Sequence, residues 1–134
     1  MQWKPLIITV TCDPALQDPL NPRCEELTTV ETIAKEYTDA TAAGAPMDHV
    51  HGIYSRDPVV QPDGRQLQVP DIPQTAAIIE TIRGKYPDMG IQQGLASMRP
   101  EQKLQLWEAI KPDMSSLNLN SHDEFFDPYP EYVN

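Results

Sequence analysis

Short apolar runs predict four strands, at residues 6–11, 47–53, 89–93 and 113–119. The first run is rich in β-branched residues and does not alternate with polar ones, which is typical of a strand buried on both faces. Between the runs, apolar residues recur every three or four positions, which predicts helices. Strand and helix therefore alternate and end on a fourth strand, as in a parallel sheet with helical crossovers.

The first predicted helix begins at a capping box formed by Thr28 and Glu31 and ends at Gly44, a residue that commonly stops helices. A proline-rich loop at residues 13–26 precedes it. Its apolar stripe consists of Val30, Ile33, Ala34, Tyr37 and Thr41.

The second predicted helix covers residues 71–85, with Asp71 and Gln74 as a cap pair. A long excursion at residues 54–70 separates it from the preceding strand. The third helix covers residues 100–110, where Leu104, Trp107 and Ile110 recur at helical spacing.

Two architectures share this α/β pattern, an open doubly wound sheet and part of an eight-stranded barrel of about 250 residues. A doubly wound nucleotide-binding sheet carries a glycine-rich turn after its first strand. Here that turn reads Thr11-Cys12-Asp13-Pro14. The sequence therefore favours a barrel, of which this chain supplies about the first four strands and three helices.

The length of 134 residues corresponds to a single domain. Ten basic and 20 acidic residues give a formal charge of −10, which disfavours nucleic acid and anionic membrane surfaces as partners. The apolar run near the N-terminus is too short for a signal peptide, so we expect a cytoplasmic protein. Two cysteines, Cys12 and Cys24, are too few for a disulfide framework and are expected to be ordinary thiols.

The second predicted strand contains His49 and His51, whose spacing places both imidazoles on one face. Parallel strands are normally apolar on both faces, so two adjacent imidazoles need a reason. They could share a metal ion, or they could be core histidines hydrogen-bonded to the backbone. A catalytic zinc usually has three protein ligands, and no third ligand is obvious in the sequence.

Other polar residues follow predicted strands, at the carboxyl ends where barrel active sites are built. Asp13 comes after the first strand and could bind substrate or metal, or serve as a turn residue before Pro14. Asn118 and Ser121 follow the fourth strand and could hold a substrate carboxylate or carbonyl, or cap backbone groups.

Several segments together resemble the β-keto acid cleavage enzymes, a family that includes the 3-keto-5-aminohexanoate cleavage enzyme. These are residues 5–11, the His49-Val50-His51 strand, Arg56-Asp57-Pro58, Met98-Arg99-Pro100-Glu101, and residues 109–118. They occur in the family's order along nearly the whole chain.

The resemblance implies a zinc-dependent (β/α)8 TIM barrel, cytoplasmic and oligomeric, that converts a β-keto acid and acetyl-CoA into acetoacetate and a new CoA thioester. It assigns His49 and His51 as zinc ligands and places Ser121 near the substrate. In family members the second half of the barrel supplies the remaining zinc carboxylate and the principal acid–base groups. We therefore expect residues 1–134 to form an N-terminal half-barrel, inactive alone, with residues 122–134 as an acidic aromatic tail or linker. Its partner would be a second copy or a complementary C-terminal half-barrel.

The chain departs from the family pattern at three places. Gly94-Leu95-Ala96-Ser97 stands where the family has a Ser-Thr-Gly-Gly turn, and extra residues separate His51 from Arg56. Where the family has an acidic residue in the loop after the first strand, this chain offers Asp13 or Asp18 without a clear register. Two alternatives stay open. An amidohydrolase-type barrel also uses a His-x-His strand, but as its first strand, and a non-catalytic half-barrel could act as a binding or assembly partner.

Overall fold

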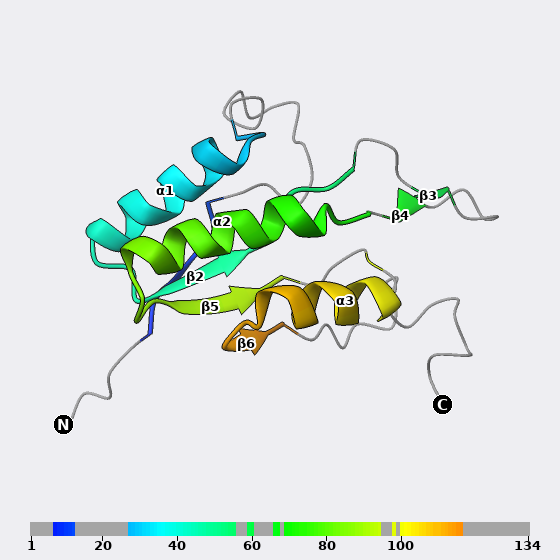
Figure 1. Cartoon of the computed structure of the whole chain (residues 1–134). Coiled ribbons are helices and arrows are strands. Elements are labelled where there is room, and N and C mark those ends of the chain that lie inside the picture. Colours follow the sequence, from blue (N-terminus) through cyan, green and yellow to red (C-terminus); the bar gives the residue numbers. More distant parts are fainter. Residues whose placement is uncertain are drawn as a thin grey trace.

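The computed structural model describes residues 7–12, 27–55, 59–60, 66–67, 69–94, 98 and 100–116. These residues form three helices and six short strands (Figure 1). The elements are, in chain order, β1 (Thr9–Val10), α1 (Val30–Ala42), β2 (Met47–Val50), β3 (Val59–Val60), β4 (Gln66–Leu67), α2 (Ile72–Lys85), β5 (Gly90–Gln93), α3 (Pro100–Ile110) and β6 (Met114–Ser115). None of these helices is long and apolar enough to cross a membrane.

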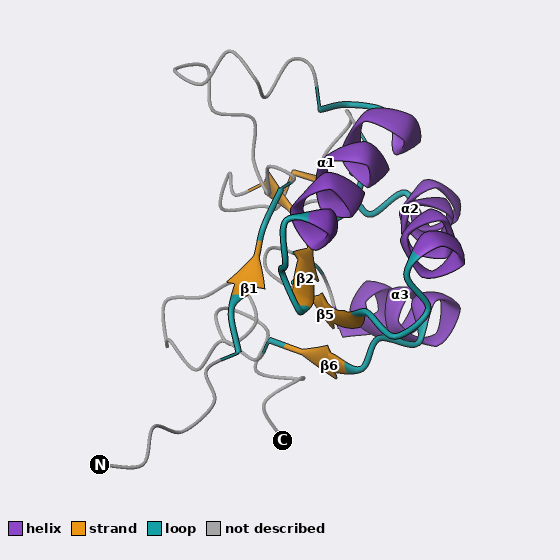
Figure 2. Cartoon of the chain, turned by 90° about the vertical axis from the view of Figure 1, so that its left-hand side faces the viewer, coloured by secondary structure: helices purple, strands orange, loops and turns teal. Residues whose placement is uncertain are grey.

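The main sheet has four parallel strands in the order β1-β2-β5-β6, the order in which they occur along the chain. Right-handed crossovers that always advance in one direction place every helix on the same face of a sheet. Figure 2 shows α1, α2 and α3 side by side along one face of the strands. A doubly wound sheet instead reverses direction and has helices on both faces. The presence of the four predicted strands and the parallel α/β class are confirmed, and the arrangement is compatible with part of a TIM barrel. The expectation that the first strand is buried on both faces was wrong, because β1 lies at the edge of the described sheet and Ile7 and Ile8 are 66% and 62% exposed.

The alternation of side chains along the central strands separates a core face, which packs against the helices, from a partly exposed face opposite the helices. Asp48 and Val50 of β2 and Ile91 and Gln93 of β5 are fully buried, whereas the intervening residues are partly exposed. The buried apolar residues of the helices pack on the core side. These residues are Ile33, Ala34, Tyr37, Ile78, Ile79, Ile82, Leu106 and Ile110.

Helix α1 begins one residue later than the sequence predicts. Its N-cap is Thr29, whose hydroxyl accepts a hydrogen bond from the Thr32 N–H at 3.2 Å. The Thr32 hydroxyl accepts in return from the Thr29 N–H at 3.2 Å. The predicted capping box of Thr28 and Glu31 was wrong. Thr28 and Thr29 are adjacent and either can cap a helix, but Thr29 is the N-cap, and the Thr32 hydroxyl takes the place expected for the Glu31 side chain. Gly44 follows the helix with a φ of 108°, as expected for a glycine stop.

Helix α2 has the predicted cap, because the Asp71 carboxylate accepts from the Gln74 N–H at 3.1 Å. The preceding excursion is closed at its base by backbone hydrogen bonds from Ser55 N–H to Val69 C=O and from Asp71 N–H to Ile53 C=O. Within the excursion, β3 and β4 pair as an antiparallel hairpin that the sequence did not predict.

Helix α3 has the predicted bounds, but two of its three expected apolar positions face outward. Leu104 is 61% and Trp107 is 48% exposed, whereas Leu106 and Ile110 are buried against the core. Both sets of residues have helical spacing, so periodicity alone does not decide which set faces the sheet.

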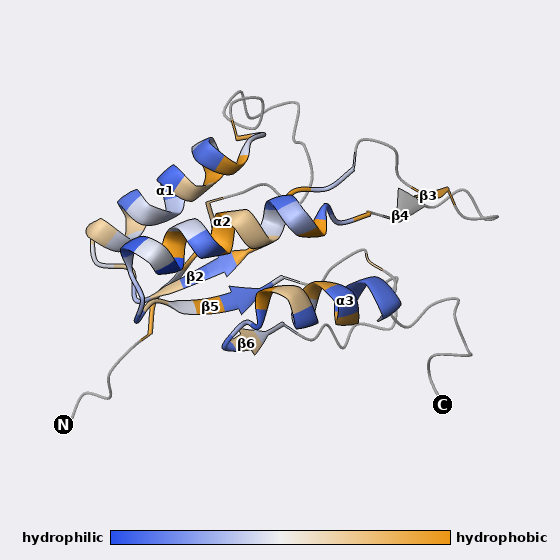
Figure 3. Cartoon of the chain, in the orientation of Figure 1, coloured by the Kyte–Doolittle hydropathy of each residue, from blue (hydrophilic) through white to orange (hydrophobic). Residues whose placement is uncertain are grey.

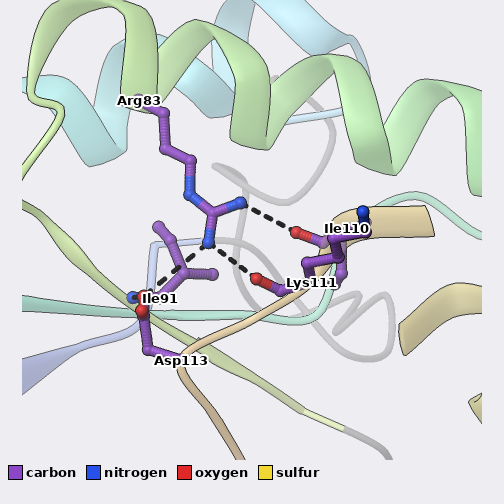
Figure 4. A network of polar contacts seen from close by, with 5 residues as sticks. All are labelled: Arg83, Ile91, Ile110, Lys111 and Asp113. Carbon is purple, nitrogen blue, oxygen red and sulfur yellow. Dashed lines mark hydrogen bonds and ion pairs between the residues drawn. The ribbon is translucent and has the colours of Figure 1, made fainter. Parts of the chain in front are cut away.

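Arg83 of α2 fixes the end of α3 and the start of β6. Its guanidinium donates to the Ile110 carbonyl at 2.8 Å and to the Lys111 carbonyl at 2.9 Å (Figure 4). The same group lies 3.7 Å from the Asp113 carboxylate, which accepts from the Ile91 N–H at 2.9 Å. These contacts hold the third helix–strand connection against β5.

Candidate functional site

His49 of β2 and His51, which directly follows the end of β2, come together on the face of the sheet opposite the helices. The Nε2 atoms of His49 and His51 are 3.2 Å apart, and their ring centroids are 4.8 Å apart with an interplanar angle of 76°. Both side chains are half-buried. The predicted placement of both imidazoles on one face is confirmed.

Both the ring and the backbone carbonyl of His49 make hydrogen bonds. The register of β2 and β5 pairs it with Gln92, whose side-chain oxygen lies 2.6 Å from His49 Nδ1. The hydroxyl of the fully buried Tyr37 of α1 donates to the His49 carbonyl oxygen at 2.6 Å. Ring and backbone are therefore fixed from opposite sides of the sheet.

His51 is positioned through its backbone by Gln93, whose side-chain amide donates to the His51 carbonyl at 3.3 Å and to the Gly94 carbonyl at 2.7 Å. The chain then leaves β2 through Gly52, which has a φ of 90°. A Cβ at Gly52 would lie 2.5 Å from Thr75 Cγ2, so α2 approaches this turn too closely for a side chain.

Gly94 provides the space into which both imidazoles pack. A Cβ there would lie 2.5 Å from His51 Cδ2 and 2.9 Å from His49 Nε2, closer than real Cβ contacts. The Gly94 N–H donates to the Val50 carbonyl at 2.9 Å, which ties this position to β2. A side chain at Gly94, which directly follows β5, would therefore require one or both imidazoles to move.

The geometry of the pair fits a shared metal ion. Two nitrogen ligands at about 2.0–2.1 Å from a tetrahedral zinc are about 3.3–3.4 Å apart, close to the 3.2 Å between the two Nε2 atoms. Two imidazoles meeting edge to face with their Nε2 atoms in contact are a donor set that zinc accepts. Among the residues that the structure describes, no group of three His, Cys, Asp or Glu side chains could complete the site.

Polar side chains are concentrated at the carboxyl ends of the central strands. Figure 3 shows hydrophilic segments in the middle of β2, which contains Asp48 and His49, and at the head of the β5 arrow, which contains Gln92 and Gln93. Parallel strands in such a layer are normally apolar. In α/β proteins this end of a parallel sheet is where ligands bind.

Comparison with known protein families shows to which family the chain belongs. The sequence profile for the beta-keto acid cleavage enzymes matches residues 5–131. The chain belongs to this family. The resemblance inferred from the sequence is thereby confirmed, and the family indicates an enzyme of the β-keto acid cleavage type. No curated protein matches the sequence.

In this β-keto acid cleavage enzyme family member, three expected substrate-binding residues, Asp13, Asn118 and Ser121, lie outside the described residues. Their roles stay predictions, as does that of residues 122–134 as a tail or linker. The residues that sequence reasoning missed are Gln92, Gln93 and Gly94. The sequence feature that could have pointed to them is two consecutive glutamines followed by a glycine, at the end of a strand that was expected to be buried.

Proposed function

We propose that this family member transfers an acyl group from a β-keto acid to CoA, using zinc held by His49 and His51. The β-keto acid and acetyl-CoA would give acetoacetate and a new acyl-CoA. The observation that carries the proposal is the 3.2 Å approach of the two Nε2 atoms over Gly94, in a chain of this family.

The reaction balances without any further reactant. The bond between the α-carbon and the keto carbon of the acid breaks, and the acyl group that contains the keto carbon ends on the CoA sulfur. The remaining two-carbon carboxymethyl unit forms a new bond with the acetyl carbonyl carbon and leaves as acetoacetate. Bound zinc would act as a Lewis acid toward the keto and carboxylate oxygens.

The chain's own residues prepare this site. His49 and His51 offer two nitrogen ligands, and Gln92, Gln93 and Gly94 of the β5 end hold them in place. Asp13, Asn118 and Ser121 are proposed to bind the substrate. The remaining zinc ligand and the acid–base groups are proposed to come from outside the described residues, in a complete barrel formed with a second copy or a complementary C-terminal half.

Zinc content tests the ligand assignment. Protein purified from its own cells with its partners should contain stoichiometric zinc, and His49→Ala/His51→Ala should lose it because two of the ligands are gone. Zinc retained by this double variant would contradict the proposal.

The matched control is Lys35→Ala/Asp39→Ala, which removes an exposed ion pair of α1. There the Lys35 ammonium donates to Asp39 and holds the pKa of that carboxyl below its usual range. This pair is not part of the site, so the control should keep its zinc.

Activity is tested with a panel of β-keto acids and acetyl-CoA. We expect acetoacetate to appear only when both substrates are present, and to disappear in the histidine double variant. Hydrolysis of amides without any requirement for CoA would instead support the amidohydrolase alternative.

A further inference from the structure

The contact between Gln92 and His49 defines the hydrogen position on the imidazole. Gln92 Oε1 lies 2.6 Å from His49 Nδ1, and Gln92 Nε2 donates to the Met114 sulfur at 3.6 Å. The amide thus points its NH2 group toward β6 and its oxygen toward the ring. Since a carbonyl oxygen only accepts hydrogen bonds, the hydrogen of this contact must lie on Nδ1.

We infer that Gln92 is a positioning residue that fixes His49 in the Nδ1–H tautomer and so reserves Nε2 for the metal. A neutral imidazole has a hydrogen on one nitrogen and a lone pair on the other. With Nδ1–H donated to Gln92, the lone pair lies on Nε2, the atom that faces His51. The inference rests on the proposed zinc site for its functional meaning.

The two histidines differ in which ring nitrogen has the hydrogen. The Nε2 atoms are 3.2 Å apart, a distance at which one of them donates a hydrogen bond to the other. Because His49 Nε2 has the lone pair, His51 must donate from its own Nε2. His49 is thus ready to bind zinc, whereas His51 must first give up its Nε2 hydrogen and take one at Nδ1.

Outer hydrogen bonds of this kind orient metal-binding histidines in many proteins, and their loss typically weakens metal affinity about 10–100-fold. Here the orienting group comes from β5 and the ligand from β2, paired by the register of His49 with Gln92. The face of the sheet opposite the helices thus supplies both the ligand and the group that orients it.

The first experiment measures tautomers in the metal-free protein. Nitrogen-15 NMR of the histidine rings, at a pH where both are neutral, distinguishes Nδ1–H from Nε2–H. We expect His49 as Nδ1–H and His51 as Nε2–H. Zinc should leave His49 in its tautomer and convert His51 to Nδ1–H.

Three variants separate positioning from a merely structural role. Gln92→Met keeps the length of the side chain but removes the acceptor, so His49 should move toward Nε2–H and zinc affinity should fall about 10–100-fold. Gln92→Glu restores an acceptor and should keep both the tautomer and an affinity within a few-fold of the unmodified protein. Gln105→Leu, on the exposed side of α3, is the control and should change neither.

The outcomes distinguish this inference from the proposed function. An unmodified protein with His49 as Nε2–H, or a Gln92→Met variant that keeps the Nδ1–H tautomer, would overturn the role of Gln92 even if zinc binds. Absence of zinc binding together with the expected tautomers would refute the zinc proposal and leave the orienting role of Gln92 supported.

Discussion

At the scale of single residues, Gly94 determines how closely the two imidazoles approach. Its ideal Cβ position lies 2.5 Å from His51 Cδ2 and 2.9 Å from His49 Nε2. Gly94→Ala should therefore push the rings apart while the backbone, which is tied to β2, keeps its path. We expect zinc affinity to fall at least tenfold, or about 1.4 kcal/mol, with a folded protein, measured by zinc titration and circular dichroism.

Gly84→Ala is the matched control for this substitution. Gly84 lies in α2, and a Cβ there would meet nothing within 4 Å. Alanine is a better helix former than glycine, so this variant should gain about 0.5–1 kcal/mol of stability and bind zinc normally. Equal zinc affinity in the Gly94→Ala and Gly84→Ala variants would show that the pair does not depend on the space at Gly94.

The sequence predicts part of this site and not the rest. His49 and His51 are two residues apart on one strand, so strand geometry alone brings them together. The roles of Gln92 and Gly94 depend on the register of β5 against β2, which pairs segments more than 40 residues apart. A register of this kind follows from packing of the whole sheet and is not encoded in local spacing.

At the scale of elements, the order of strands and helices and the three helix positions could be predicted from periodicity, because each helix has an apolar stripe. The hairpin of β3 and β4 was missed because two-residue strands give no periodic signal. In α3 the stripe of Leu104 and Trp107 proved to be exposed. A helix with two apolar stripes is oriented by its neighbours, here α2 and the sheet, rather than by its own pattern.

Arg83 couples α2 to α3 and β6, and its removal should loosen that connection. Arg83→Met keeps the aliphatic stem but loses the hydrogen bonds to the Ile110 and Lys111 carbonyls. Hydrogen bonds to a charged group contribute about 1.5–3 kcal/mol each when well shielded, and the Arg83 side chain is 33% exposed. We therefore expect a loss of about 1–3 kcal/mol in total, measured by urea unfolding.

Lys85→Met controls for the loss of a positive charge in the last turn of α2, where such a charge interacts favourably with the helix dipole. Lys85 is exposed, and its ammonium lies 5.4 Å from the ring centre of Tyr86. The Lys85→Met substitution should lower the free energy of unfolding by well under 1 kcal/mol. Similar losses in both variants would show that charge at the end of α2, and not the contacts with α3, accounts for the effect.

At the scale of the whole molecule, all three helices that the structure describes lie on one face of the sheet. Val50 and Ile91 are buried on the side of the helices, whereas His49 and Gln92 alternate with them and are partly exposed on the opposite side. The parallel class and the strand order follow from the sequence. Closure into a barrel does not, because it depends on which strands meet the two edges of this sheet, and local patterns contain no information on that.

The edges of the sheet lead to a prediction about association. Among the described residues, β1 pairs only with β2, and Ile7 and Ile8 beside it are 66% and 62% exposed. Exposed apolar edge strands pair with other chains unless a charge or proline blocks them. We expect the 134-residue chain to associate in a concentration-dependent manner in sedimentation experiments, and Ile8→Lys to reduce this association.

Val60→Lys is the matched control, because Val60 is 63% exposed but lies in the separate β3–β4 hairpin. If both substitutions reduce association equally, general exposure of apolar surface and not the β1 edge drives it; if neither does, the contact lies elsewhere on the molecule.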